Sequence, residues 1–176
     1  MILARHYTKE DGWGDAWSLS SSTSNGDDSR QPQIAIDANG NAFAVWSQGA
    51  YLFGYHTQDS IYASRYTPET GWSGTERINP YLAGTESPQI SIDSNGNAMV
   101  VWKDRDGHHG FLAVKANQYT VGSGWGEATY VEEMYSGSVD SPQVAIDAYG
   151  SAIVIWLYDE SYTDQWNVWA NRFDLN

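Results

Sequence analysis

The sequence predicts an all-β repeat protein whose unit is a four-stranded antiparallel sheet. Three observations support this class. A pattern of 15 residues recurs at Pro32–Trp46, Pro88–Trp102 and Pro142–Trp156, so successive copies start 56 and 54 residues apart. A second, shorter pattern recurs between these copies, and no segment shows a convincing helical period of 3.6 residues. Repeats of this length are typical of proteins that place one supersecondary unit beside the next.

Each copy of the long pattern predicts a β-hairpin. In the first copy Pro32 opens a strand in which Ile34 and Ile36 share one face. The segment Asp37–Gly40 then predicts a turn, because Asp and Asn side chains bond to nearby backbone and Gly accepts a positive φ. The second strand, Ala42–Trp46, is apolar on both faces, so it is expected to be buried on both. We call these two strands a and b.

The shorter pattern predicts two further strands, c and d. Strand c is expected at Ile61–Tyr66, Val114–Tyr119 and Val168–Phe173, and the segment Ile2–Tyr7 matches it as well. Strand d opens on a Gly-Trp pair and ends on an apolar residue, at Trp13 and Leu19, Trp72 and Ile78, and Trp125 and Val131. Regular placement of Trp46, Trp102 and Trp156 at the end of strand b favours packing between sheets over a ligand platform.

These strands predict a single repeat domain. The order along the chain is c-d, a-b-c-d, a-b-c-d and a-b-c, which corresponds to residues 1–31, 32–87, 88–141 and 142–176. Polar, Ser-rich Ser18–Arg30 is expected to be a long loop between strands d and a. Four-stranded antiparallel units of this length are typical of β-propeller blades, of which the chain supplies about three.

The repeat resembles those of bacterial β-propeller proteins. Asp37, Gly40 and Trp46 resemble the Asp-box blades of sialidase-like proteins, and the Gly-Trp pair at Trp72 resembles the blades of propeller lectins. The usual Asp-box spaces its Asp, Gly and Trp more closely than this chain does. The resemblance therefore implies a propeller fold and carries over no catalytic residue.

Composition excludes several classes of partner. The 22 acidic residues outnumber 9 basic ones and give a net charge of −13, which repels phosphate backbones and anionic lipid headgroups. No apolar run approaches the ~20 residues that span a bilayer, so neither nucleic acid nor membrane insertion is expected. The absence of cysteine excludes disulfides and thiolate metal sites, and no cofactor is expected. The first residues are too short and too polar for a signal peptide, so the chain is either cytoplasmic or a piece of an exported protein. An extracellular or cell-surface location is the favoured expectation.

The strand count also predicts an assembly. A propeller closes with about 4–8 blades, more than one chain supplies. The final a-b-c unit could take strand d from the first residues of a second copy, so that a homodimer completes a ring of six blades with one strand c left over at each junction. The alternative is that the chain is part of a longer propeller.

The loops predict a binding face. The b–c and d–a connections are expected on one face, and the b–c loops are long and differ between repeats. Varied loops on a rigid scaffold are the usual arrangement for binding, and aromatic rings beside carboxylates suit a sugar. The expected ligand-binding residues are Tyr51, Tyr55, His56 and Asp59 in the first loop, Asp104, Asp106, His108 and His109 in the second, and Tyr158, Asp159, Tyr162 and Trp166 in the third.

Metal binding is the less favoured interpretation of two acidic patterns. The Asp that opens each a–b turn, Asp37, Asp93 or Asp147, is expected to form the turn and not a calcium loop, because the third copy lacks the oxygen ligands at alternating positions. Asp104, Asp106 and His108 are the candidates for a divalent cation, with a solvated loop as the alternative.

The sequence favours a non-catalytic recognition module that binds a glycan, or another neutral surface ligand or protein, through this loop face. No G-x-S-x-G or H-E-x-x-H motif is present, so an enzyme is not expected. Two alternatives stay open: a glycoside hydrolase or lyase fragment, and a structural or protein-interaction scaffold of a larger surface protein.

Overall fold

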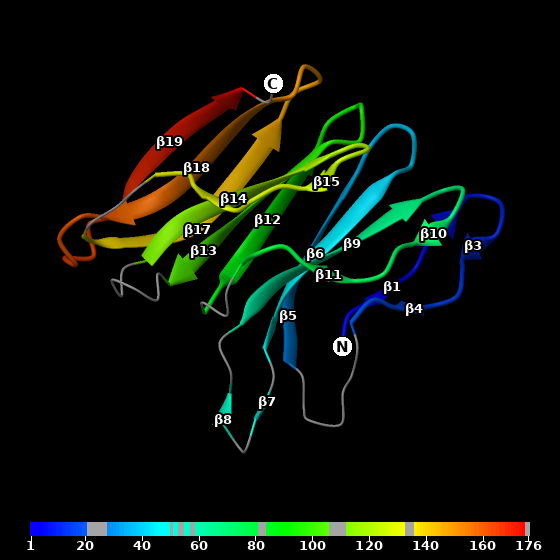
Figure 1. Cartoon of the computed structure of the whole chain (residues 1–176), viewed down its shortest axis with the longest axis horizontal. Coiled ribbons are helices and arrows are strands. Elements are labelled where there is room, and N and C mark those ends of the chain that lie inside the picture. Colours follow the sequence, from blue (N-terminus) through cyan, green and yellow to red (C-terminus); the bar gives the residue numbers. More distant parts are fainter. Residues whose placement is uncertain are drawn as a thin grey trace.

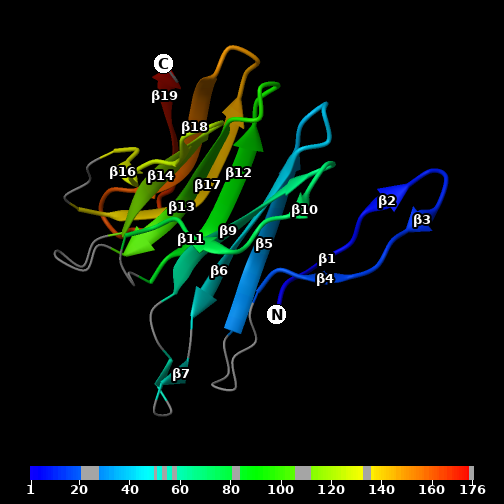
Figure 2. The same cartoon turned by 45° about the vertical axis from the view of Figure 1, so that its right-hand side comes forward.

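The computed structural model describes the backbone of residues 1–20, 28–49, 51–52, 55–56, 59–80, 84–105, 112–132 and 136–174, and the side chains of these residues except at 51–52 and 55–56. The described residues form antiparallel strands and turns and include no helix, which confirms the all-β class. Three sheets and an N-terminal group of strands lie side by side in chain order (Figures 1 and 2). Among the described residues, no helix could cross a membrane.

The first two sheets contain the whole a-b-c-d unit. The first sheet consists of β5 (Asp28–Ile36), β6 (Ala42–Gly49), β9 (Ser60–Thr67), β10 (Gly71–Trp72) and β11 (Glu76–Arg77). The second consists of β12 (Glu86–Ile92), β13 (Ala98–Arg105), β14 (Leu112–Thr120), β15 (Gly124–Trp125) and β16 (Thr129–Tyr130). In each, strand d is divided into two short strands that both pair with strand c.

The other strands form shorter assemblies. The third sheet has the order β17 (Ser138–Ile146), β18 (Ser151–Asp159) and β19 (Asn167–Asp174). The N-terminal strands are β1 (Leu3–Ala4), paired with β4 (Trp17–Ser18), and β2 (Tyr7–Thr8), paired with β3 (Gly12–Trp13). A separate pair is formed by β7 (Tyr51–Leu52) and β8 (Tyr55–His56). The predicted sequence of strands a, b, c and d is thus present, but the described residues form no closed barrel or propeller.

Strand a begins earlier than predicted. It starts at Asp28 in the first sheet, so the last residues of the predicted loop Ser18–Arg30 belong to a strand, as does Ser18 itself. Pro32 does not open the strand but follows a β-bulge, where the register shifts between Arg30 and Gln33. Gln31 adopts a φ of 52°, and the residues before the equivalent prolines, Ser87 and Ser141, do the same at 56° and 50°. A proline is tolerated here because a bulge interrupts the ladder of hydrogen bonds.

The a–b turns confirm the prediction for the Asp residues. The Asp37 carboxylate accepts hydrogen bonds from the backbone N–H of Asn39 and Asn41, each at 2.8 Å, and Gly40 adopts a φ of 84°. Asp93 makes the same pair of bonds in the second sheet.

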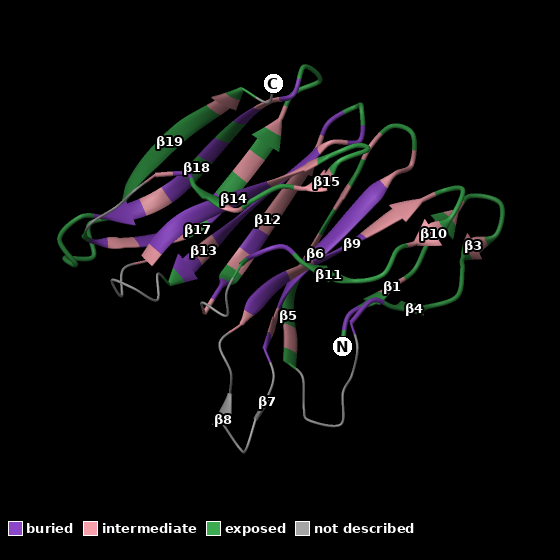
Figure 3. Ribbon diagram, in the orientation of Figure 1, coloured by how far each residue is buried: buried purple, intermediate pink, exposed green. Residues whose placement is uncertain are grey.

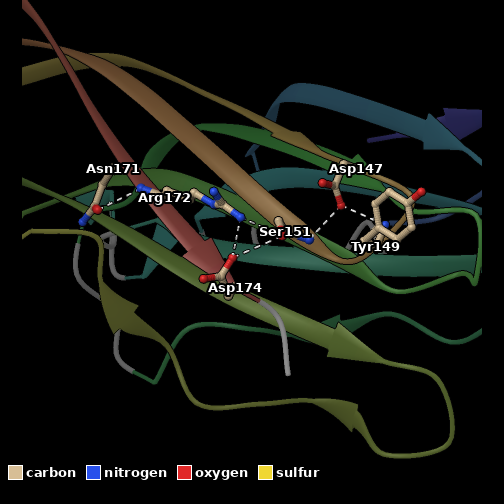
Figure 4. A network of polar contacts seen from close by, with 6 residues as sticks. All are labelled: Asp147, Tyr149, Ser151, Asn171, Arg172 and Asp174. Atoms are coloured by element: carbon tan, nitrogen blue, oxygen red, sulfur yellow. Dashed lines mark hydrogen bonds and ion pairs between the residues drawn. The ribbon is translucent and has the colours of Figure 1, made fainter.

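The third turn keeps the backbone bonds and changes the side chains. Asp147 accepts from the N–H of Tyr149 and Ser151 (Figure 4). The Ser151 hydroxyl lies 3.2 Å from Asp174, which also pairs with Arg172 at 3.0 Å. The three turns thus share the Asp carboxylate and a Gly of positive φ three positions later.

The sheets pack face to face through apolar clusters. Each sheet buries the tryptophan that ends its predicted strand b, which is Trp46, Trp102 or Trp156. This tryptophan belongs to an apolar cluster that its sheet shares with the sheet or N-terminal strands before it in the chain. This confirms the packing role predicted for these three residues. Strand b is buried on both faces in β6 and β13 but not in β18, where Ile153 and Ile155 are exposed (Figure 3). The prediction of two-sided burial is wrong there, because no described strand covers the second face.

Candidate functional site

Half of the residues predicted to bind a ligand lie where no side chain is described. Asp106, His108 and His109 fall outside the described residues. Tyr51, Tyr55 and His56 lie on β7 and β8, of which only the backbone is described, with Tyr51 opposite His56. Their role as ligand-binding residues stays a prediction.

Asp59 lies in a polar cluster that connects the first sheet to the loop before the second. The Ser47 hydroxyl donates to Asp59 Oδ2 over 3.2 Å, and Arg30 Nη2 lies 3.8 Å from the same oxygen. The backbone carbonyl of Asp59 accepts from the Thr85 hydroxyl at 3.0 Å. The carboxylate is thus engaged with its own scaffold.

Asp104 is buried near the end of β13. Its Oδ2 accepts from Trp102 Nε1 at 3.1 Å, and its Oδ1 lies 3.4 Å from Lys115 Nζ. The Lys115 ammonium in turn lies 4.7 Å from the ring centroid of Tyr130. No group of three or more potential metal ligands occurs among the described residues, while Asp106 and His108 lie outside them.

The bond between Trp102 and Asp104 reveals a position that the sequence analysis missed. Trp46 Nε1 donates to Gln48 Oε1 at 2.9 Å, so the residue two positions after the tryptophan supplies the acceptor in both of the first two sheets. The third sheet has Tyr158 there. Its hydroxyl donates to the Ser136 carbonyl at 3.3 Å instead, and Trp156 Nε1 has no hydrogen-bond partner among the described residues.

Asp159 organises the third loop. Its carboxylate accepts hydrogen bonds from the backbone N–H of Ser161, Thr163 and Asp164, at 3.1, 3.2 and 2.8 Å. Burial acts to raise the pKa of this carboxyl, but the hydrogen bonds outweigh it and hold the pKa below its ordinary value of 3.8. Tyr162 in the same loop adopts a φ of 54°, and both Tyr162 and Trp166 are exposed. This loop therefore presents aromatic side chains on a fixed turn.

A pocket that the sequence did not predict lies between the first and second sheets. It has a volume of about 360 Å³. The residues that define its chemistry are Phe43, Arg65, Thr67 and Glu76 of the first sheet, and Tyr119 and Trp125 of the second.

Three aromatic rings form one side of this pocket. The ring centroid of Phe43 lies 4.7 Å from that of Tyr119 and 5.5 Å from that of Trp125, with edge-to-face angles of 60° and 71°. Tyr119 and Trp125 are themselves 5.5 Å apart. Phe43 is fully buried and the other two rings are half-buried, so the cluster is a fixed apolar surface beside solvent.

Arg65 is the unusual residue of the pocket. Its guanidinium carbon lies 5.6 Å from the Tyr119 centroid and 5.9 Å from that of Phe43, so the cation is held against aromatic rings. Arg65 forms no salt bridge with a described residue, and its buried Nε has no hydrogen-bond partner among them. A buried N–H without an acceptor is costly, so Arg65 retains an unmet hydrogen-bonding capacity beside the pocket.

A second pocket of about 360 Å³ occupies the equivalent place between the second and third sheets. Gln118 and Phe173 line it at the positions that Arg65 and Tyr119 hold in the first pocket, and Trp125 contributes to both. The sequence signal that could have found these pockets is the strand-c position shared by Arg65, Gln118 and Arg172.

Comparison with known proteins does not assign this chain to a family. No protein-family model and no curated protein matches the chain. The solved structures to which it is similar include an endo-arabinase from Bacteroides thetaiotaomicron VPI-5482, with 15% identity and a TM-score of 0.47 over 82% of this chain and 56% of that one. A protein of unknown function from Dyadobacter fermentans DSM 18053 has 9% identity and a TM-score of 0.42, over 82% of this chain and 65% of the other. A sialidase from Trypanosoma rangeli has 10% identity and a TM-score of 0.39, over 97% of this chain and 34% of the sialidase. The chain thus spans less than two thirds of the length of each of these structures.

Proposed function

We propose that this chain is a non-catalytic recognition module that binds a glycan unit in the pocket between the first and second sheets. The observation that carries the proposal is the Arg65 guanidinium, which lies against Phe43 and Tyr119 and makes no hydrogen bond or ion pair with the described residues. Its sheets would be blades of a β-propeller, as the repeat resemblance implies, in a protein of the cell surface or the extracellular space.

The pocket combines the contacts that sugar recognition needs. A pyranose ring presents apolar C–H groups on its faces, which pack against aromatic rings such as those of Tyr119 and Trp125. Its hydroxyls both accept and donate hydrogen bonds. Arg65 would donate to one of them, and the carboxylate of Glu76, which also lines the pocket, would accept from another. Burying an otherwise unpaired guanidinium N–H against a ligand oxygen favours the bound state.

The loop face remains a second proposed region of contact. Tyr162 and Trp166 are exposed beside the turn that Asp159 organises, so two aromatic rings are available there. We propose that these two residues, with Tyr51, Tyr55 and His56 of the first loop, contact a more distal part of a glycan or a protein that bears it.

The proposal predicts a specific loss of affinity in Arg65→Met, a change that keeps most of the side-chain length and removes the donors. Affinity for the best ligand from a glycan array should fall by about ten- to a hundredfold in calorimetry, because a charge-assisted hydrogen bond is lost. The matched control is Arg77→Met, since Arg77 is exposed one strand away and does not line the pocket. Equal losses in both variants, or no binding across a diverse array, would refute the assignment.

A glycoside hydrolase or lyase fragment is the alternative to test. Release of new reducing ends from a polysaccharide by the wild type, and its loss in Glu76→Gln, would make the pocket a catalytic site. Binding without release supports the recognition module.

A further inference from the structure

One face of the third sheet is apolar and uncovered. Ile153 and Ile155 of β18 are 53% and 41% exposed, and Val168 of β19 is 72% exposed. These three residues are called the front surface. Figure 3 shows β19 exposed along nearly its whole length, whereas the equivalent strands β9 and β14 are buried or half-buried along nearly all of theirs.

In the first two sheets the equivalent side chains lie at an interface between sheets. They are at most 3% exposed, at Phe43, Val45 and Ile61 in the first sheet and Met99, Val101 and Val114 in the second. The repeat therefore builds the same apolar surface three times, and the following sheet covers it twice.

Strand a of the following sheet supplies part of that cover. Ile90 packs against the cluster that contains Val45, and Val144 and Ile146 pack against the cluster that contains Met99 and Val101. The partner of the front surface is thus a strand with the pattern of β12 or β17.

The chain carries such a strand uncovered at its other end. Ile34 and Ile36 of β5 are 64% and 65% exposed, although they match Ile90 and Ile92, which are half-buried. Leu3 and Trp13 of the N-terminal strands are exposed as well, whereas Trp72 and Trp125, which open strand d in the first two sheets, are half-buried. Ile34 and Ile36 are called the back surface.

We propose that the front surface of one copy binds the back surface of a second copy, with Ile153 and Ile155 packed on Ile34 and Ile36. Each copy then reproduces between chains the contact that it makes twice within the chain. The contact is heterologous, because two different surfaces meet, and it closes into a ring or continues head to tail according to the rotation between copies. Both β19 and the β1–β2 segment correspond to strand c of the repeat, so at the junction they compete for one place in the sheet. One of them must therefore move aside.

The electrostatics of the chain give this contact a recognisable salt dependence. Each copy has a net charge of −13, so copies repel one another at low ionic strength. Salt screens that repulsion and leaves the apolar contact in place. Association should therefore strengthen as salt is added, whereas an ion-paired interface would weaken.

Sedimentation across the micromolar range tests the proposal. The wild type should form dimers or larger species, and the front variant Ile153→Glu/Ile155→Glu and the back variant Ile34→Glu/Ile36→Glu should each be monomeric, with association weakened at least about tenfold. Tyr149→Glu is the matched control, because Tyr149 is 91% exposed in the a–b turn and lies on neither surface. A monomeric wild type would overturn the proposal.

Mixing the two variants separates this contact from misfolding and from a symmetric one. An equimolar mixture should form heterodimers, because the front variant keeps an intact back surface and the back variant an intact front surface. A back variant that still dimerises alone, or a mixture that stays monomeric while both variants show cooperative unfolding, would overturn the proposal. Neither result depends on glycan binding.

Discussion

At the scale of the residue, five described aspartates hold other parts of their own chain in place. Asp37, Asp93 and Asp147 each close an a–b turn, Asp104 accepts from a buried indole, and Asp159 accepts from three backbone N–H groups. The three backbone hydrogen bonds to Asp159 favour its ionised form.

This predicts a pH dependence for Asp159→Asn. Because the pKa of Asp159 lies below 3.8 in the folded state, its stabilising contribution is present above that value and is lost as the pH falls through the folded pKa. The thermal midpoint of the variant should lie below that of the wild type at pH about 7 and 5, and the gap should narrow at pH about 3. Glu160→Gln is the control, since Glu160 is exposed in the same loop and accepts none of these bonds. A gap that stays constant across this range would contradict the assignment.

At the scale of the element, the β-bulge before each proline is a repeated feature that the sequence pattern concealed. Ser87 adopts a φ of 56°, and its N–H donates to Gln31 Oε1 of the preceding bulge at 2.7 Å. A residue with a side chain in this left-handed region is strained, most of all a β-branched one. The strain is retained because the bulge lets strand a pair on both sides of the proline.

Two substitutions at Ser87 should therefore act in opposite directions. Ser87→Gly keeps the N–H donor and relieves the strain, so the free energy of unfolding should rise by up to about 1 kcal/mol, whereas Ser87→Val should lower it by about 1–2 kcal/mol. Ser94→Gly is the control, because the φ of Ser94 is not in the left-handed region, and it should be mildly destabilising. Urea unfolding measures all three. If Ser87→Gly lowered the free energy of unfolding as much as Ser94→Gly does, the bulge would not be strained.

At the scale of the whole molecule, polar contacts supplement the apolar clusters between sheets. Lys103 Nζ lies 2.8 Å from Glu86 of its own sheet and 3.4 Å from Asp140 of the third. Burial acts to lower the pKa of Lys103, but the hydrogen bonds and charges of Glu86 and Asp140 outweigh it and raise the pKa above 10.5. The lysine therefore stays charged at neutral pH and joins two sheets.

Lys103→Met should lower the free energy of unfolding by about 0.5–1 kcal/mol, a modest figure because the pair is partly solvated. The loss should be equal at pH about 7 and 9, since this stabilisation is full below the ordinary lysine pKa and is lost only as the pH rises through the raised one. Lys9→Met, at an exposed turn, should change little. A loss that shrinks already between these two pH values would contradict the ion-pair account.

The sequence alone determined the features that depend on neighbours along the chain. The a–b turn arises from bonds between residues two to four apart, as from Asn39 and Asn41 to Asp37, so a copy of the pattern specifies a copy of the turn. The strand order and the burial of Trp46, Trp102 and Trp156 follow from apolar patterning repeated in step.

Only the tertiary structure decided which copies of a pattern are buried, paired or free. Ile153 and Phe43 occupy the same place in their hairpins, yet one is exposed and the other buried, because burial depends on whether another sheet lies beside them. Arg65 meets Tyr119 across 54 positions of sequence, and no local pattern encodes that contact. Asp104, predicted as a ligand-binding residue, is buried in β13, where it contacts Trp102 and Lys115. Short-range hydrogen bonds form between residues of the same repeat, so the sequence of that repeat specifies them. The pocket forms where one repeat packs on the next, and the uncovered surfaces occur where no described repeat packs.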